Sequence, residues 1–305
     1  MWLPFALELK LLHPLRLPHR HRLLFLSETQ IRKTVVFIEL VCKDGRTLMD
    51  VKGTGFFVSL PAPEIGKDMQ FTYLVTNRHV ALCWNDDRHP MEVQSVSLRG
   101  NLKNGSSTTV PINPQWFFPS DESVDLAVCP IVPSAEADVI GIPISMFATK
   151  DVLSSRNVVE GSRILFTGFF YQFPGERKIQ PIVREGILAM LPDEPLTTVT
   201  GKPGSVYLGD VHIFHGNSGS PVFVDVVNGL GTLGFPDFRF LGVVSGNFSE
   251  DQDFNLQIAL TVKGTQHANS GIAIIVPADS VKALIEGDPG LKDARQAALR
   301  AAHAK

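Results

Sequence analysis

Short β-rich runs separated by turn residues recur along most of this chain, and they restrict the folds that it can adopt. Each run is dominated by apolar, β-branched and aromatic residues, while Gly, Pro, Asn and Asp gather between the runs. The runs cover residues 34–41, 54–60, 71–76, 126–132, 163–167, 179–190, 222–227, 240–244 and 272–276. Strands of this length and spacing predict an all-β sandwich or barrel. A helix is first indicated at residues 278–286, where Asp279 and Ser280 can cap its N-terminus.

The strand pattern lapses in the middle of the chain and resumes at Gly161, which divides the sequence into two halves. A chain of 305 residues is long enough to bury the cores of two such units. The expected segments are a flexible extension over residues 1–33, an N-terminal β-unit over 34–140, a linker over 141–160, a C-terminal β-unit with its helix over 161–287, and a helical tail over 288–305.

Charge is unevenly distributed along the chain. Residues 1–34 carry six Lys and Arg against two Glu, although the net charge of the whole chain is −3. The remaining body is therefore acidic, which argues against a nucleic-acid-binding role.

The N-terminal stretch is apolar and basic, but Glu8, Lys10, His13 and three prolines interrupt it. Neither a signal peptide nor a transmembrane segment is therefore expected there. By default this favours a cytoplasmic protein of bacterial type. Binding of a membrane surface or a partner by the arginines at positions 16, 20 and 22 stays open as an alternative.

The chain has three cysteines, and an odd number without an evident signal peptide argues against a disulfide framework. Cys42, Cys83 and Cys129 are therefore expected to be reduced. Apolar residues flank Cys83 and Cys129 in the sequence, and such surroundings disfavour a thiolate, so a catalytic cysteine is not expected.

The segment Gly216-Asn217-Ser218-Gly219-Ser220-Pro221 lies between two strand-like runs. Glycines on both sides of a serine allow a tight turn that exposes the hydroxyl and directs backbone N–H groups to one point. The same composition also occurs in ordinary turns. Ser218 is therefore a candidate nucleophile whose assignment depends on other motifs.

Two further motifs supply a candidate base and a candidate acid. His79 follows the apolar run at 71–75, and Asp125 opens the run at 126–132. Taken alone, a histidine at a strand end or an aspartate at a strand start is usually structural. Together with Ser218 they appear in the order His, Asp, Ser, with spacings of 46 and 93 residues.

At these three motifs the sequence resembles the chymotrypsin-like serine peptidases, and more closely their HtrA-type branch. Three other runs resemble strands of that family, namely 53–58, 186–188 and 271–274. The resemblance implies two six-stranded antiparallel β-barrels with a C-terminal helix. It also implies a serine endopeptidase that acts on protein or peptide substrates without a cofactor.

The resemblance also assigns roles to individual residues. It makes Ser218 the nucleophile, His79 the general base and then acid, and Asp125 the carboxylate that orients the imidazole. The backbone N–H groups of Gly216 and Ser218 would form the oxyanion hole. The substrate pocket would have His212 at its base and Ser245, Gly246 and Asn247 in its wall, which disfavours cleavage after Arg or Lys.

Departures from the family pattern accompany the resemblance. Asn217 replaces the aspartate that pairs with a new N-terminus in activatable members, so no proteolytic activation is expected. Val80 replaces the cysteine that usually follows the histidine, so the family's disulfide at that point is not expected. No PDZ module fits after Glu286.

Other sites are less well supported by the sequence. His212 and His215 are spaced so that an extended chain would place them on opposite faces, and no metal site is expected. The acidic run at 250–253 is interpreted as a solvated turn rather than a calcium site. Two functional alternatives stay open: a catalytically silent fold that binds peptides or proteins, and an esterase with the same triad.

Overall fold

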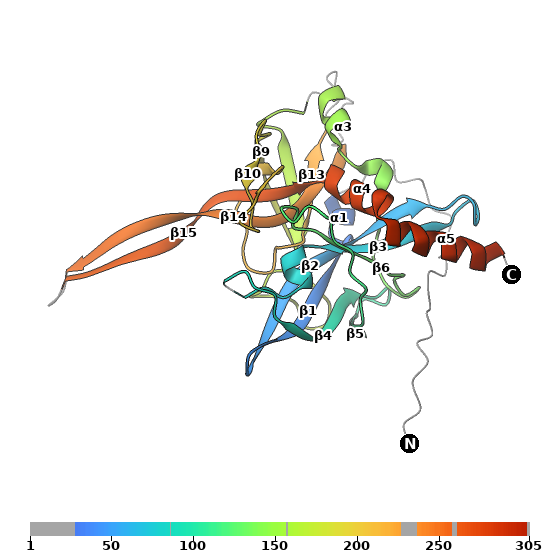
Figure 1. Cartoon of the computed structure of the whole chain (residues 1–305), viewed down its shortest axis with the longest axis horizontal. Helices are drawn as coiled ribbons and strands as arrows, with labels where there is room; N and C mark the ends of the chain where they lie inside the picture. Colours follow the sequence, from blue (N-terminus) through green and yellow to red (C-terminus); the bar gives the residue numbers. More distant parts are fainter. Residues whose placement is uncertain (1–27, 86, 157, 227–236, 258–260, 304–305) are drawn as a thin grey trace.

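The computed structural model describes residues 28–303 except 86, 157, 227–236 and 258–260. Two β-sheets form its body, and two helices follow them at the C-terminal end (Figure 1). The elements of the first half are α1 (Glu28–Ile31), β1 (Val35–Asp44), β2 (Thr47–Pro61), β3 (Gln70–Thr76), α2 (Arg78–Ala81), β4 (Glu92–Asn101), β5 (Ser107–Ile112), β6 (Ala127–Pro130), β7 (Ile142–Pro143), the 3-10 helix η1 (Ile144–Met146) and α3 (Lys150–Ser155).

The N-terminal sheet has the strand order β5-β4-β1-β2-β3-β6, and β7 adds to β2 in parallel. Its long central strand β2 pairs with β1 and β3 in an antiparallel register, for example Gly55 with Val36 and Phe56 with Val75. The outer edge of β6 meets Phe117 through an isolated bridge to Val128. The loop before Asp125 therefore lies along this edge of the sheet.

The second half forms a closed barrel in the order β12-β15-β14-β13-β8-β9. A pair of two-residue strands, β10 and β11, lies outside the barrel in a sheet of its own. The elements of this half are β8 (Arg163–Gly168), β9 (Ile182–Met190), β10 (Leu196–Thr197), β11 (Pro203–Gly204), β12 (Tyr207–Asp210), β13 (Pro221–Asp225), β14 (Phe238–Gln257), β15 (Thr261–Pro277), α4 (Ala278–Gly287) and α5 (Pro289–His303).

The largest hydrophobic cluster runs through both sheets and the C-terminal helices. The ring of Phe56 in β2 lies 5.3 Å from that of Phe240 in β14, and Phe223 in β13 lies 6.3 Å from Phe240, centroid to centroid. All three side chains are fully buried. Since burial of large aromatic side chains dominates core energetics, this shared cluster holds the two halves together.

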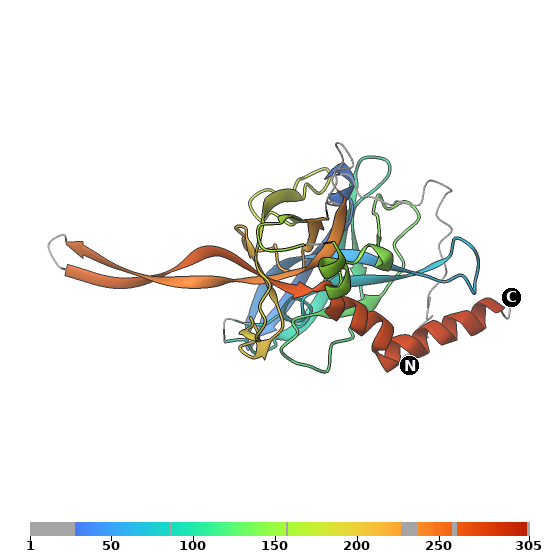
Figure 2. The ribbon, with the colours of Figure 1, turned by 90° about the horizontal axis from the view of Figure 1, so that it is seen from above.

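Strands β14 and β15 continue beyond the barrel as a two-stranded ribbon that projects from the body on the side opposite α5 (Figures 1 and 2). The pairing extends from Ser249 with Asn269 to Gln257 with Thr261. In this part of the ribbon β14 and β15 pair with each other, and no other described strand pairs with them.

Helix α4 packs against β14 and β15 of the barrel, and α5 reaches the N-terminal sheet. Val281 and Ile285 in α4 and Leu291 in α5 belong to the shared core, and Arg295 donates a hydrogen bond to the hydroxyl of Tyr73 in β3 at 3.0 Å. The N-cap of α4 is Pro277, so the expected capping by Asp279 or Ser280 is wrong. No helix in the described part of the chain is long and apolar enough to span a membrane.

The predicted fold class is confirmed: the protein is mostly β, with a closed six-stranded barrel, a second sheet and C-terminal helices. The expected tail contains α5, and the expected linker contains β7, η1 and α3. Residues 1–27 of the expected flexible extension lie outside the described residues. The division into domains at 140 and 161 stays a prediction.

Candidate active site

Ser218 lies in a sharp turn between β12 and β13. Gly216 and Gly219 on either side of it have φ angles of +92° and +85°, in the left-handed region that favours glycine. A Cβ atom at Gly216 would collide with the ring of Phe169, and one at Gly219 would collide with the carbonyl oxygen of Thr54. The glycines flanking the serine are therefore required both by backbone conformation and by space.

His79 lies in the one-turn helix α2, directly after β3, and both oxygens of Asp125 face it. The Nδ1 atom of His79 lies 2.7 Å from Oδ2 of Asp125, and the backbone N–H of His79 donates to Oδ1 at 3.0 Å. Since a carboxylate only accepts, Nδ1 carries the proton in this pair and Nε2 is left as an acceptor. Asn77 donates to the backbone oxygen of Asp125 at 2.9 Å, which fixes the acid from a second side.

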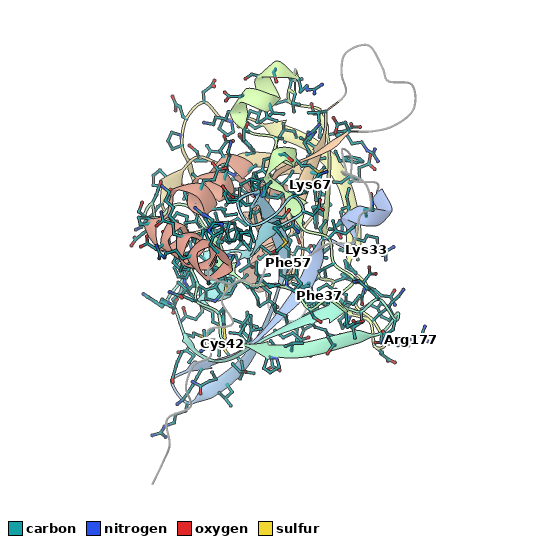
Figure 3. The ribbon with its side chains drawn as sticks, turned by 90° about the vertical axis from the view of Figure 1, so that its right-hand side faces the viewer. Lys33, Phe37, Cys42, Phe57, Lys67 and Arg177 are labelled. Atoms are coloured by element: carbon teal, nitrogen blue, oxygen red, sulfur yellow. A yellow bond between two sulfur atoms is a disulfide. The ribbon has the colours of Figure 1, made fainter. Side chains whose placement is uncertain are left out.

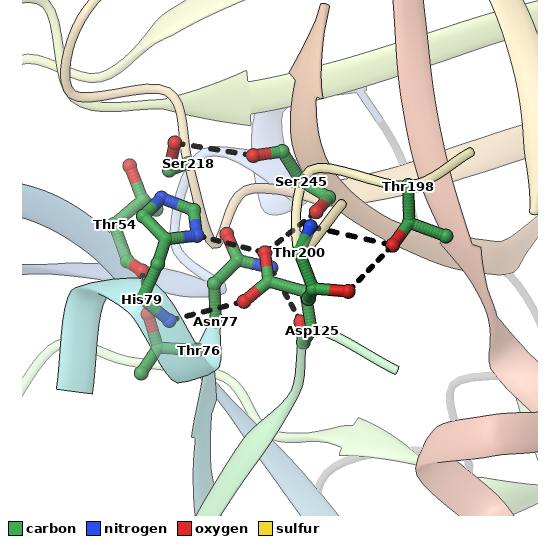
Figure 4. A network of polar contacts seen from close by, with 9 residues as sticks. All are labelled: Thr54, Thr76, Asn77, His79, Asp125, Thr198, Thr200, Ser218 and Ser245. Carbon is green, nitrogen blue, oxygen red and sulfur yellow. Dashed lines mark hydrogen bonds and ion pairs between the residues drawn. The ribbon is translucent and has the colours of Figure 1, made fainter. Parts of the chain in front are cut away.

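Asp125 is fully buried and receives a third donor from the other half of the chain. The hydroxyl of Ser245 in β14 donates to Oδ2 of Asp125 at 2.6 Å (Figure 4). Burial alone would raise the pKa of Asp125, but the nearby His79 and the hydrogen bonds from His79 and Ser245 outweigh it and hold the pKa below its usual value. The carboxylate therefore stays charged at neutral pH.

The hydroxyl of Ser218 donates to the backbone oxygen of Ser245 at 3.5 Å. In Figure 4 the second ring nitrogen of His79 faces Ser218. Among the described residues no hydrogen bond joins His79 to Ser218, and such bonds are often long before substrate is present. The structure thus brings His79, Asp125 and Ser218 into one site, with the serine hydroxyl turned onto Ser245.

The backbone of the turn leaves two amides available beside Ser218. The carbonyl of Ser218 accepts from the N–H of Thr54 at 2.9 Å, and the carbonyl of Gly216 accepts from the Thr54 hydroxyl at 2.8 Å. Within the described part of the chain, the N–H groups of Gly216 and Ser218 have no acceptor. Paired amides of this kind can stabilise an oxygen that gains negative charge.

The residues predicted to form the substrate pocket lie at one end of the C-terminal barrel. The exposed ring of His212 packs against Gly271 in β15, while Asn247 in β14 pairs with Ala273, two residues further along β15. Asn247 donates its side-chain amide to the backbone oxygen of Phe248 at 3.1 Å. The strands thus gather His212 and Asn247 at the same end of the barrel, and the pocket itself stays a prediction.

Two contacts at this end of the barrel have no signal in the sequence. Ser245, expected in the pocket wall, has its hydroxyl on Asp125 instead of free for a substrate. A Cβ atom at Gly246 would lie 2.5 Å from a methyl group of Val199, in the loop between β10 and β11. Both contacts join segments that are distant in sequence, so no local motif encodes them.

The expectation of three reduced cysteines is wrong. Cys42 in β1 (Figure 3) forms a disulfide with Cys83, just after α2, with a Cα–Cα separation of 6.4 Å. The bond therefore ties β1 to the turn behind His79, although Val80 occupies the position next to the histidine. Cys129 is free and buried, and burial raises its pKa to about 12, which makes it a poor nucleophile.

In the regions that the structure describes, no group of three or more His, Cys, Asp or Glu side chains could hold a metal ion. The side chains of the acidic run at 250–253 lie outside the described residues.

Comparison with known proteins adds evidence on the family. The family model described as trypsin-like peptidase domain matches residues 53–229, a range that includes His79, Asp125 and Ser218. A search of curated proteins found no match.

Similar solved structures include Deg5, with 18% identity, a TM-score of 0.48 and coverage of 85% of this chain and 92% of that one. Another is the HtrA-type protease AlgW with a decapeptide, with 17% identity, a TM-score of 0.47 and coverage of 85% and 66%. The family model alone spans more than half of the sequence. The chain therefore belongs to the trypsin-like peptidase domain family.

Proposed function

We propose that this protein is a serine endopeptidase that cleaves protein or peptide substrates through an acyl-enzyme on Ser218. The observation that carries the proposal is the contact between His79 and the buried Asp125, whose carboxylate receives Nδ1 at 2.7 Å and the backbone N–H at 3.0 Å. This arrangement selects the imidazole tautomer whose Nε2 can accept a proton. The nucleophile and two available amides lie in the adjoining turn.

The reaction would proceed in two halves. Nε2 of His79 takes the proton of the Ser218 hydroxyl as Oγ attacks the scissile carbonyl carbon, and the N–H groups of Gly216 and Ser218 hold the resulting oxyanion. The imidazolium then gives its proton to the leaving amine as the C–N bond breaks. Water attacks the acyl group with His79 again as base, and proton return to Oγ releases the acid.

Attack requires a change at Ser218 before the first step. Its hydroxyl donates to the carbonyl of Ser245 at 3.5 Å, a weak hydrogen bond. Rotation about χ1 of Ser218 would exchange this acceptor for Nε2 of His79. Staggered rotamers of an exposed or half-buried serine exchange rapidly, so the energy involved is small beside the chemical barrier.

Asn217 supports a turn that needs no proteolytic activation. Its side chain is fully buried, accepts from the N–H of Phe214 at 2.8 Å and donates to the oxygen of Phe169 at 2.6 Å. Both hydrogen-bonding groups of a neutral side chain are thus satisfied within the chain. A newly formed terminal ammonium would have no counter-charge at this position.

A second candidate is a binding protein on the same fold. The observation in its favour is the Ser218 hydroxyl itself, which bonds Ser245 instead of His79. In such a protein the site would hold a peptide without transferring its acyl group, and Ser218 would not react with an electrophile.

Covalent labelling separates the two candidates. Full-length protein is incubated with a fluorophosphonate probe and with a peptide library at neutral pH, beside Ser218→Ala and His79→Ala. We expect labelling and cleavage in the wild type as purified, and neither in the variants, both of which should remain folded. Absence of labelling in folded wild type, or cleavage by purified Ser218→Ala, would overturn the proposed mechanism.

A further inference from the structure

A closed ring of hydrogen bonds connects the N-terminal sheet to the turn that carries Ser218. Thr54 in β2 is fully buried, and its hydroxyl donates to the oxygen of Gly216 at 2.8 Å. The same hydroxyl accepts from the N–H of Phe169 at 2.8 Å. Asn217 donates its side-chain amide to the oxygen of Phe169 at 2.6 Å, which closes the ring.

The ring fixes the peptide unit between Gly216 and Asn217. Thr54 bonds the carbonyl oxygen of this peptide, which belongs to Gly216. At the other end of the peptide, the side chain of Asn217 bonds the oxygen of Phe169 and the N–H of Phe214. Gly216, which precedes this held peptide, has a φ of +92°. This angle, together with ψ, relates the held peptide to the N–H of Gly216, which the proposed mechanism places in the oxyanion hole.

Thr54 also acts through its backbone, because its N–H donates to the oxygen of Ser218 at 2.9 Å. In addition, Thr76 donates its hydroxyl to the oxygen of Thr54 at 2.8 Å, which anchors Thr54 to the start of the segment that leads to His79. Thr54, a residue of the first half, therefore bonds the carbonyl oxygens of both Gly216 and Ser218 in the turn.

The hydroxyl is needed at this point because two buried backbone groups depend on it. Among the described residues, the oxygen of Gly216 and the N–H of Phe169 have Thr54 as their partner and no other. A hydroxyl donates and accepts at once, which suits a carbonyl and an amide on either side of it. Valine has the same shape and can satisfy neither group.

We propose that Thr54 is a positioning residue for the oxyanion hole, which acts on the reaction through Gly216 without touching the substrate. The proposal rests on the proposed function. Loss of an oxyanion-hole donor costs on the order of 10²–10³ in kcat. Removal of the Thr54 hydroxyl misdirects a donor that is still present, so the expected loss is smaller, about 10- to 100-fold.

The test compares three variants of the full-length protein. Thr54→Val removes the hydroxyl and keeps the side-chain shape, while Thr54→Ser keeps the hydroxyl. Thr34→Val is the matched control, because Thr34 is also fully buried and donates its hydroxyl to a backbone oxygen, that of Ile31 at 2.8 Å, away from the turn. All three are measured for melting temperature, kcat, KM and the rate of fluorophosphonate labelling.

We expect Thr54→Val to lower kcat by about 10- to 100-fold with KM within about two-fold of wild type, because an oxyanion contact forms chiefly in the transition state. Thr54→Ser should stay within about three-fold of wild type in kcat. Thr34→Val removes one buried hydrogen bond, so it should also lose stability, but it should keep its kcat. Equal kcat in Thr54→Val and Thr34→Val, or a loss in Thr54→Ser as large as in Thr54→Val, would overturn the proposal.

Amide hydrogen exchange supplies a readout that does not depend on activity. In Thr54→Val the amides of Phe169, Phe214 and Asn217, which have acceptors in the wild type, should exchange faster than in wild type, and in Thr54→Ser and Thr34→Val they should not. Unchanged exchange in Thr54→Val would refute the ring as a constraint on the turn. Wild type that neither labels nor cleaves would instead refute the proposed function, whatever the exchange rates show.

Discussion

Reduction of the disulfide between Cys42 and Cys83 tests a covalent bond that the sequence did not predict. The two cysteines are 41 residues apart in the chain. Closing a loop of that length lowers the entropy of the unfolded chain, and the relation between loop length and entropy gives a stabilisation of about 4 kcal/mol at 25 °C. We therefore expect the free energy of unfolding to fall by about this amount when the bond is reduced.

The location of the bond extends the effect to the active site. Cys83 follows α2 directly, and the N–H of its neighbour Trp84 donates to the oxygen of His79 at 3.1 Å. Reduced protein should therefore lose fluorophosphonate labelling at a lower urea concentration than oxidised protein. Tryptophan fluorescence in urea with and without dithiothreitol measures the unfolding, and labelling at each urea concentration measures the site.

A thiol count decides whether the bond forms. Denatured protein purified without reductant should show one thiol, from Cys129, and reduced protein should show three. Cys129→Ala is the control, since it removes the free thiol and should keep the sensitivity to dithiothreitol. Three thiols without reductant, or equal stability in both states, would refute the reasoning. Disulfides persist mainly in oxidising compartments. A thiol count on protein whose thiols were blocked inside the cell therefore also tests the expected cytoplasmic location.

Four further outcomes follow from the site. The pKa of Asp125 is lowered in the folded protein, so its charged form adds stability above the unfolded pKa of 3.8, and this stability is lost as the pH falls below that value. The difference in unfolding free energy between wild type and Asp125→Asn should therefore narrow in acid. A difference that stays constant with pH would contradict this. Asp125→Asn should also lower kcat on the order of 10⁴-fold at neutral pH through the wrong tautomer. Gly216→Ala should abolish labelling, because its Cβ would collide with Phe169 at a φ of +92°; wild-type labelling would show that the turn relaxes. Exposed His212 offers no negative charge to a substrate cation, so a peptide library should show weak cleavage after Arg or Lys, and dominant cleavage there would refute the pocket assignment.

The parts of the site that the sequence predicted are those whose requirements are local. Ser218 needs glycines on either side because its turn has positive φ angles, and these glycines lie within two residues of it in the sequence. Short runs of apolar, β-branched and aromatic residues between turn residues similarly identify strands. His79 and Asp125 became candidates only through their order relative to Ser218, since neither position is distinctive by itself.

The parts that were missed depend on which segments meet in space. Cys42 and Cys83 are brought together by the path of β1 past the end of α2, which no spacing rule encodes. The odd number of cysteines argued against a disulfide framework, whereas the fold pairs Cys42 with Cys83 and leaves Cys129 unpaired. Ser245 follows an ordinary apolar run, and its contact with Asp125 spans 120 residues.

The same long-range contacts explain why neither half of the chain carries a complete site. In the proposed mechanism the base and its orienting carboxylate come from the first half, whereas the nucleophile and both oxyanion amides come from the second. Two side-chain hydrogen bonds join these groups across the boundary, from Ser245 to Asp125 and from Thr54 to Gly216. Both hydrogen bonds are buried, and a displaced donor there would leave an unsatisfied polar group at a cost of about 1–3 kcal/mol. Packing between the halves and geometry in the site are therefore coupled, and a substitution that shifts one half against the other should lower activity before it unfolds the protein.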